Sequence, residues 1–232
     1  MISGKQRFRW GYFGVLVVAL WVGWPLVICA QNRDAGFHKV RWVADGDTLI
    51  LEDDRHVRYL GINAPETAHD GQPAQPFGNA ARRYNRRLVA HQMVRLEFDR
   101  ERRDRFGRWL AHVYRRDGLW VNRAMVTEGL AIYLYTPKNT KHGQALLAAQ
   151  REAMQARRGL WQPGPAADLW QGRYLGNRRS RRFHTPDCPF GRQTSRHNRI
   201  WFHSQWGAYF DGYAPGSNCL GRAPGAAPET RP

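Results

Sequence analysis

The sequence predicts an α+β protein, in which a small β-barrel with helices packed on it precedes a short C-terminal module that carries cysteine and histidine. Its 232 residues, 42% hydrophobic and 12% aromatic, suffice for one domain of ordinary size and a small second one. Between residues 37 and 158, short segments with strand character are mixed with helical ones. A Pro-Gly-Pro break at 163–165 then separates a second segment, which contains Cys188 and Cys219.

The individual elements follow from hydrophobic periodicity and from turn residues. Strands are predicted over five segments: 37–44, 48–52, 56–61, 94–98 and 109–114. Helices are predicted over three segments: 78–90, 121–128 and 144–158. Gly129 and Gly159 are expected to end the second and third helices, because glycine is the preferred residue after a helix. The order of three strands, one helix, two strands and two helices suits a barrel of the oligonucleotide-binding type.

The N-terminus has the composition of an export or anchoring signal. Lys5, Arg7 and Arg9 precede an almost wholly apolar stretch at 12–28. Ile28-Cys29-Ala30 provides a cleavage site, although the stretch is also long enough to remain as a membrane anchor. Either alternative places the rest of the chain outside the cytoplasm, whether periplasmic, secreted or membrane-anchored.

The net charge of +17 indicates a polyanionic partner, either nucleic acid or an anionic membrane surface. Three classes of function remain open. The first is an exported nuclease, and the second is a non-catalytic module that holds single strands on the same barrel. The third is a basic surface protein that binds anionic lipid or cell-wall polymer. The hydrophobic content excludes a wholly disordered chain, and the absence of repeats excludes a solenoid.

Three separated stretches carry residues suited to phosphodiester hydrolysis: Asp45–Thr48, Arg58–Thr67 and Asp104–Arg108. Oxygen atoms from Asp47, Asn63 and the Ala64 carbonyl are ligands that suit a hard cation such as Ca²⁺. Glu66 could position or deprotonate a water molecule. Arg58 and Arg108 could hold the phosphate and stabilise charge on its oxygens.

The same stretches carry a resemblance to the staphylococcal-nuclease-like, or thermonuclease, family, which extends from about Val40 to Trp161. The matching pieces occur in family order: Asp45-Gly-Asp-Thr48, Val57-Arg-Tyr-Leu-Gly-Ile-Asn-Ala-Pro-Glu-Thr67, Asp104-Arg-Phe-Gly-Arg108, Val121-Asn122, Glu128-Gly-Leu-Ala131 and Tyr133-Leu-Tyr-Thr-Pro137. The resemblance implies a five-stranded barrel with three helices. It also implies a calcium-dependent phosphodiesterase that cleaves single-stranded DNA and RNA to 3′-phosphate ends.

The resemblance also implies roles for individual residues. Arg58, Glu66 and Arg108 match the catalytic positions. Asp47 matches a calcium carboxylate, and Ala64 matches a ligand that uses only its carbonyl. Three residues match aromatic positions at the bound nucleotide: Phe106, Tyr133 and Tyr135. Two positions depart from the family: Asn63 replaces a usual calcium-binding Asp, and Phe106 replaces a common Tyr.

The C-terminal segment resembles the small zinc-binding module of the Ada DNA-repair protein. His184, Cys188 and Cys219 match three liganding positions, while Gly216 matches the fourth and has no side chain. Zn²⁺ could bind with His197, His203 or water as the fourth ligand. The alternative is a Cys188–Cys219 disulfide, which an exported location favours. The arginine run at 178–182 would suit phosphate contacts.

These observations predict a monomer that acts on DNA and RNA and associates with a membrane if its signal is retained. Its expected parts are a signal peptide or anchor, a nuclease-like domain, a linker, a zinc-module-like domain and a flexible tail. Their boundaries, in that order, are 1–30, 37–162, 163–172, 173–221 and 222–232.

Overall fold

The structure is a computed structural model that describes Met1 and residues 36–69, 71–163 and 171–216. The predicted signal segment, most of the predicted linker, Cys219 and the predicted tail lie outside these residues. Among the described residues, no helix has the length and apolar character needed to cross a membrane.

Five strands form a closed barrel in the order β1-β2-β3-β6-β5, which confirms the predicted fold class. Their bounds are β1 Phe37–Val43, β2 Thr48–Leu51, β3 His56–Tyr59, β5 Met93–Glu97 and β6 Trp109–Arg115. All neighbouring strands are antiparallel except β3 and β6, which are parallel. Apolar side chains at alternate positions, such as Leu49, Val57 and Val94, fill the interior. The pairing of β2 with β3 matters for the site, because it places the start of β2 beside the end of β3.

Three helices pack around the barrel: α1 Gly78–Val89, α2 Val121–Thr127 and α3 Gly143–Gln155. Gly129 follows α2 with a φ of 66°, as predicted for a residue that ends a helix. The prediction that this helix extends to Arg158 and is ended by Gly159 is wrong. The helix ends at Gln155, Arg157 already has a φ of 53°, and Gly159 begins a short 3₁₀ helix, Gly159–Trp161.

Two short strands were not predicted: β4, Ile62–Asn63, and β7, Ile132–Tyr133. They pair antiparallel, with Ile62 opposite Tyr133 and Asn63 opposite Ile132. Two residues are too few to show the alternation by which a strand is recognised in a sequence. This pair brings the loop after β3 to the segment that carries Tyr133.

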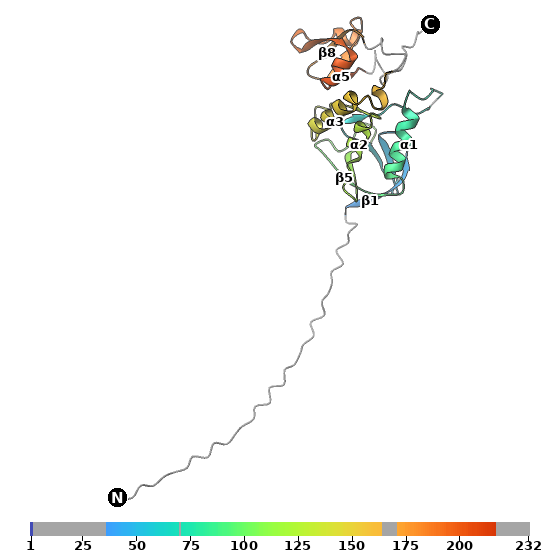
Figure 1. Cartoon of the computed structure of the whole chain (residues 1–232), viewed down its shortest axis with the longest axis vertical. Helices are drawn as coiled ribbons and strands as arrows, with labels where there is room; N and C mark the ends of the chain where they lie inside the picture. The colour runs from blue at the N-terminus through green and yellow to red at the C-terminus, as the bar shows by residue number, and fades with distance from the viewer. Residues whose placement is uncertain (2–35, 70, 164–170, 217–232) are drawn as a thin grey trace. The chain divides into compact units, whose positions relative to one another are not determined.

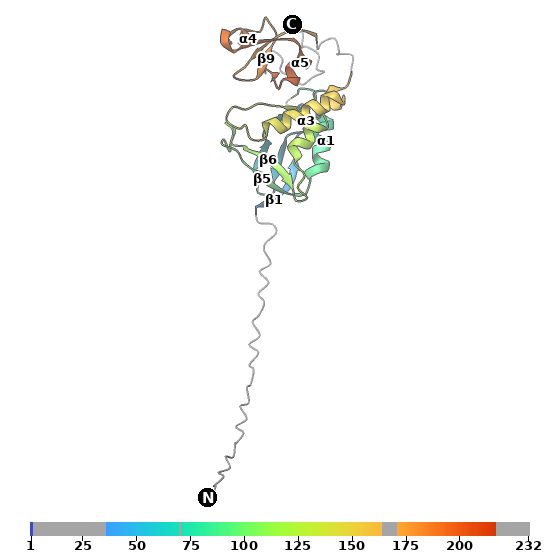
Figure 2. The ribbon, with the colours of Figure 1, turned by 60° about the vertical axis from the view of Figure 1, so that its left-hand side comes forward.

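The C-terminal module contains a four-stranded sheet in the order β10-β8-β9-β11. Its elements are β8 Gln171–Asn177, β9 Arg182–His184, α4 Pro189–Arg192, the 3₁₀ helix Arg196–Asn198, β10 Arg199–Ser204, α5 Gln205–Phe210 and β11 Ala214–Pro215. Helix α3 packs against α2 and also against α5 (Figures 1 and 2).

One apolar cluster joins α3 and its surroundings to the C-terminal module. On the α3 side it contains Ile132, Ala153, Met154, Leu160 and Trp161. On the module side it contains Tyr174, Phe183, Phe202, Ala208, Tyr209, Tyr213 and Ala214. All of these side chains are buried. The module therefore shares a core with the segment that follows the barrel.

Candidate functional site

A buried ion pair between Asp47 and Arg58 lies at the centre of the site. Asp47 immediately precedes β2, and Arg58 on β3 is the register partner of Thr48, so barrel pairing alone brings the two residues together. Arg58 Nη1 lies 2.7 Å from Asp47 Oδ2, and their side chains are 14% and 7% exposed. Asp47 Oδ2 also accepts a hydrogen bond of 2.5 Å from the Ala64 N–H.

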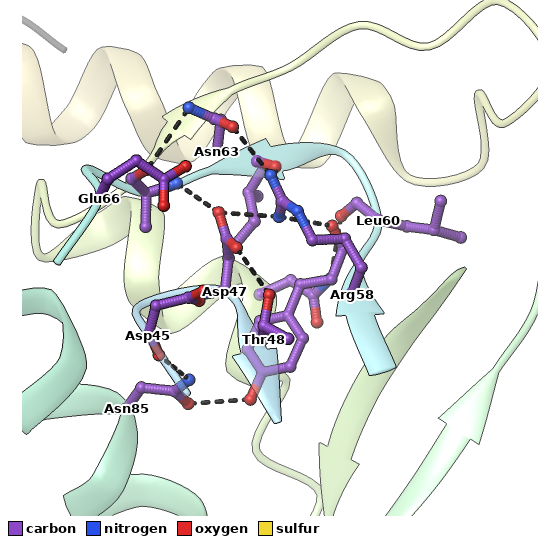
Figure 3. A network of polar contacts seen from close by, with 12 residues as sticks. Asp45, Asp47, Thr48, Arg58, Leu60, Asn63, Glu66 and Asn85 are labelled. Carbon is purple, nitrogen blue, oxygen red and sulfur yellow. Dashed lines mark hydrogen bonds and ion pairs between the residues drawn. The ribbon is translucent and has the colours of Figure 1, made fainter. Parts of the chain in front are cut away.

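The positive charge of Arg58 does not fully offset the groups that raise the pKa of Asp47. Burial raises the pKa of Asp47, and Arg58 opposes that rise. The carboxylates of Asp45 and Glu66 raise the pKa of Asp47 further. Figure 3 shows Asp45 and Glu66 beside Asp47. An additional cation would stabilise this group of carboxylates.

Asn63 lies on β4, where its carboxamide contacts both Arg58 and Ala64. Asn63 Oδ1 accepts a hydrogen bond of 2.8 Å from Arg58 Nη2 (Figure 3). Its Nδ2 donates to the Ala64 carbonyl at 3.4 Å. Arg58 Nη1 also donates to the Ile62 carbonyl, at 3.1 Å. Arg58 therefore ties the loop that carries Asn63 to the carboxylate of Asp47.

Glu66 follows this loop and is exposed to solvent. Its backbone is fixed by Gln75, which accepts from the Glu66 N–H and donates its own N–H to the Glu66 carbonyl. The start of α1 also approaches closely, since a Cβ on Gly78 would lie 2.1 Å from the Glu66 carbonyl oxygen. The Glu66 carboxylate is thus solvent-accessible on a fixed backbone, as a group that handles a proton of water requires.

Arg108 lies in the turn before β6 and is held by Asp104. Arg108 Nε donates to Asp104 Oδ2 at 2.7 Å, and Asp104 Oδ1 accepts from the Arg108 backbone N–H. Arg108 is adjacent in sequence to Trp109, the register partner of Val57. Within the described residues, the structure records no hydrogen bond or ion pair between Arg108 and the Asp47–Arg58 network. Phe106, in the same turn, is 67% exposed.

Tyr133 and Tyr135 lie on and just after β7, and both line a cavity. The Tyr133 N–H donates to Gln150 Oε1 on α3 at 2.7 Å. The Tyr135 carbonyl accepts from both Nη atoms of Arg182, at 3.3 Å each. Phe106 lies on a different turn and does not line this cavity.

Sequence reasoning missed Asn85, which supports the Asp45–Asp47 loop from α1. This fully buried side chain accepts a hydrogen bond of 2.8 Å from the Tyr59 hydroxyl and donates to the Asp45 carbonyl at 3.0 Å. The loop also fits closely, since a Cβ on Gly46 would lie 2.5 Å from that of Ala64. The only signal in the sequence was an uncharged polar residue within an arginine-rich helix.

Replacing Asn85 with alanine should therefore disturb the site from a distance. Both the Tyr59 hydroxyl and the Asp45 carbonyl lose their partner, which costs about 1–3 kcal/mol of stability for buried polar groups. Chemical denaturation of Asn85→Ala measures this loss. Asn79→Ala, on the same helix but at an exposed position, is the matched control and should stay within about 0.5 kcal/mol of the original chain. Equal stability of the two variants would exclude the supporting role of Asn85.

The donor set around Asp47 fits a hard cation, because every candidate ligand atom is an oxygen. These atoms belong to Asp47, Asn63 and the Ala64 carbonyl. No group of three or more His, Cys, Asp or Glu side chains that could hold a metal is present among the described residues. In the C-terminal module Cys188 is disulfide-bonded, and its Sγ lies 3.4 Å from His184 Nδ1. A sulfur atom that is held in a disulfide is not a thiolate ligand, so this module favours the disulfide alternative over a zinc site.

Comparison with known proteins identifies the barrel. Residues 56–163 match the family described as "Staphylococcal nuclease homologue". The chain is 35% identical over 163 residues to a thermonuclease of Staphylococcus intermedius. The aligned region covers 64% of this chain and 96% of that protein. It is 34% identical over 134 residues to a thermonuclease of Staphylococcus hyicus, and the aligned region covers 56% of this chain and 79% of that protein. An uncharacterized endonuclease of Escherichia coli O157:H7 is 36% identical over 154 residues, covering 65% and 90%.

Proposed function

Because the chain belongs to the staphylococcal nuclease family and is a hydrolase of the nuclease type, we propose that it is a calcium-dependent enzyme that cleaves single-stranded DNA and RNA. The proposed products carry 3′-phosphate ends. The observation that supports this activity most directly is the buried Asp47–Arg58 ion pair beside the exposed carboxylate of Glu66. Asn63 and the Ala64 carbonyl complete the proposed metal-binding set.

In the proposed mechanism, Glu66 accepts a proton from a water molecule, whose oxygen attacks phosphorus. The bond between phosphorus and the 5′ oxygen breaks, and the leaving oxygen takes a proton from solvent to become a 5′ hydroxyl. Arg58 and Arg108 donate hydrogen bonds to the phosphate oxygens, on which negative charge grows during attack. Asp47, Asn63 and the Ala64 carbonyl would hold a calcium ion, which would supply further positive charge to stabilise the phosphate during attack. Phe106, Tyr133 and Tyr135 are proposed to contact the bound nucleotide.

We propose that the enzyme acts outside the cytoplasm. The support is the charged and then apolar sequence at 5–28, which either is removed or anchors the monomer in a membrane. For the C-terminal module we propose Cys219 as the disulfide partner of Cys188, since Cys29 belongs to the export segment. The resemblance of this module to a zinc-binding module then concerns its fold rather than its metal. Thiol titration and metal analysis of the intact protein separate the two alternatives.

The activity is tested with purified protein, single-stranded DNA and RNA, and millimolar calcium. We expect cleavage that stops when calcium is chelated and resumes when it is restored, with 3′-phosphate ends on the products. Folded protein that binds the oligonucleotides but leaves them intact would instead indicate a non-catalytic single-strand-binding barrel.

Asn63→Asp should lower the calcium concentration that gives half-maximal activity. The substitution adds one negative charge to the proposed metal-binding set, and charge count tunes calcium affinity at oxygen sites. We expect an affinity gain of several-fold to about tenfold, or on the order of 1 kcal/mol. Calorimetric titration with calcium measures the affinity without reference to activity.

The control for this prediction is Asn79→Asp, which adds the same charge at an exposed position on α1. It should not raise calcium affinity. An unchanged or weaker affinity in Asn63→Asp would show that Asn63 is not a calcium ligand. In that outcome the amide remains only a partner of Arg58.

A further inference from the structure

A cavity of about 520 Å³ lies between the segment that carries the two tyrosines and the C-terminal module. Tyr133, Tyr135, Arg178 and Arg181 are among the residues that line it. Its volume falls in the range of roughly 300–1,000 Å³ that is usual for small-ligand sites. The cavity therefore has room for part of a nucleic-acid strand and is shared by two parts of the fold.

Hydrogen bonds fix the two parts of the fold that share this cavity relative to each other. Gln150 on α3 accepts from the Tyr133 N–H and donates to the Tyr209 carbonyl in α5, at 2.7 and 2.6 Å. Arg182 on β9 donates to the Tyr135 carbonyl through both of its Nη atoms. The buried cluster around Trp161 lies behind these contacts. The cavity is thus largely preformed, which lowers the cost of ordering it around a ligand.

The charges that line the cavity favour an anion. Arg178 and Arg181 are exposed, and neither forms an ion pair with a carboxylate in the described part of the chain. Arg181 Cζ lies 4.9 Å from the centroid of the Tyr213 ring, which places its guanidinium over an aromatic face. Arg151 also lines the cavity, while Asp211 is the single acidic lining residue. Net positive charge beside two tyrosine rings suits a phosphate that is attached to a base.

The arginine run of the module divides by role in this arrangement. Arg182 holds the Tyr135 carbonyl. Arg178 and Arg181 line the cavity, whereas Arg179 does not. If these arginines served only to solvate a hairpin, no common location would be expected. Instead, two of them line one cavity and a third binds the segment that carries the tyrosines.

We propose that Arg178 and Arg181 form a second phosphate-binding subsite, which holds the phosphate of a nucleotide next to the one at Tyr133 and Tyr135. The proposal rests on the proposed function, since it assigns the ligand as a strand of DNA or RNA. It adds that the C-terminal module lengthens the binding site beyond the barrel. The enzyme should consequently favour oligonucleotides over substrates with a single nucleotide, which are too short to occupy both positions.

The test compares two full-length variants that each lose two charges from the same module. Arg178→Gln/Arg181→Gln removes the proposed subsite, and Arg179→Gln/Arg196→Gln removes two exposed arginines that do not line the cavity. Glutamine retains the Cβ, so the backbone of Arg181, with its φ of 53°, is no more strained than before. Arg178→Gln alone provides a variant that does not touch that backbone.

Binding of a fluorescent single-stranded 12-mer is measured in chelator, where no hydrolysis is needed. At about 150 mM salt we expect the Kd of the subsite variant to rise about tenfold, and that of Arg178→Gln about threefold, since each removes charge-assisted phosphate contacts. The slope of log K against log salt should flatten by about 1.4 in the subsite variant and by about 0.7 in Arg178→Gln, because each phosphate contact to a single strand contributes about 0.7. The control variant should stay within about twofold.

Cleavage in calcium provides the second readout. The subsite variant should lose kcat/KM on the 12-mer but remain within about twofold of the original chain on a single nucleotide that carries an aryl phosphate on its 5′ oxygen. Equal loss of binding in the subsite and control variants would overturn the proposal and would identify the effect as general surface charge. Selective loss of binding in a protein that hydrolyses nothing would instead support the subsite while refuting the proposed nuclease activity.

Discussion

Glu66→Gln lowers kcat by about 100-fold or more and leaves the fold intact. This is the expected result if Glu66 accepts the proton of the attacking water, because general-base groups contribute on that scale. Stability should change little, since Glu66 is exposed and its side chain holds no part of the loop in place. Only its backbone is bound, by Gln75. Single-turnover kinetics with saturating oligonucleotide isolate the chemical step from binding and product release.

Glu52→Gln is the matched control, because Glu52 is an exposed carboxylate at the turn after β2 and its ion pair among the described residues is with Lys39. Its kcat should remain within about twofold of the original chain. A Glu66→Gln enzyme that retains nearly its full rate would show that another group takes the proton. Asp45, which also lies beside Asp47, would then be the next residue to test (Figure 3).

Arg58→Ala is expected to affect both activity and stability. Activity should fall by at least about 100-fold, because a donor to the phosphate is lost. Stability should fall by about 3 kcal/mol or more, since breaking a buried pair leaves Asp47 as an uncompensated charge. The side chain also loses its hydrogen bonds to Asn63 and to the Ile62 carbonyl, so the loop is released. Denaturant unfolding and initial rates provide the two measurements.

The double variant Arg58→Ala/Asp47→Asn separates these two effects. It removes the charge that Arg58 leaves behind, and the Asn amide oxygen can still accept from the Ala64 N–H. We therefore expect stability to recover in part while activity stays lost. If Arg58→Ala alone were as stable as the original chain, the ion pair would not hold this site together.

The sequence allowed the barrel to be predicted because its five strands are long enough to show alternation. The ordered motifs also placed Asp47, Arg58 and Asn63 in one neighbourhood, where the structure has them in contact. Sequence reasoning could not find β4 and β7, which are too short to have a period. It also could not find Asn85, whose partner Asp45 lies 40 positions away. Such a contact depends on how a helix docks on the barrel, which no local pattern encodes.

The attachment of the C-terminal module could not be predicted from the sequence for a similar reason. Its apolar residues, such as Phe183 and Tyr209, were visible in the sequence, but a separate small core was the natural interpretation. The structure instead places them in one cluster with Met154 and Trp161. Whether an apolar face packs within its own module or against a neighbour depends on shape complementarity, which is not encoded in periodicity. For this reason the cavity between Tyr133 and Arg181 could not be foreseen.

The contact of Gln150 with Tyr133 and Tyr209 also orders the events of folding. Barrel pairing within residues 37–115 requires no residue of the module, whereas the Gln150–Tyr209 hydrogen bond requires a residue of α5. As the chain is synthesised, the barrel can therefore assemble while the segment of Tyr133 still lacks its last partners. Those partners arrive only once Tyr209 has emerged, so the two tyrosines that line the cavity are fixed after the barrel strands have paired.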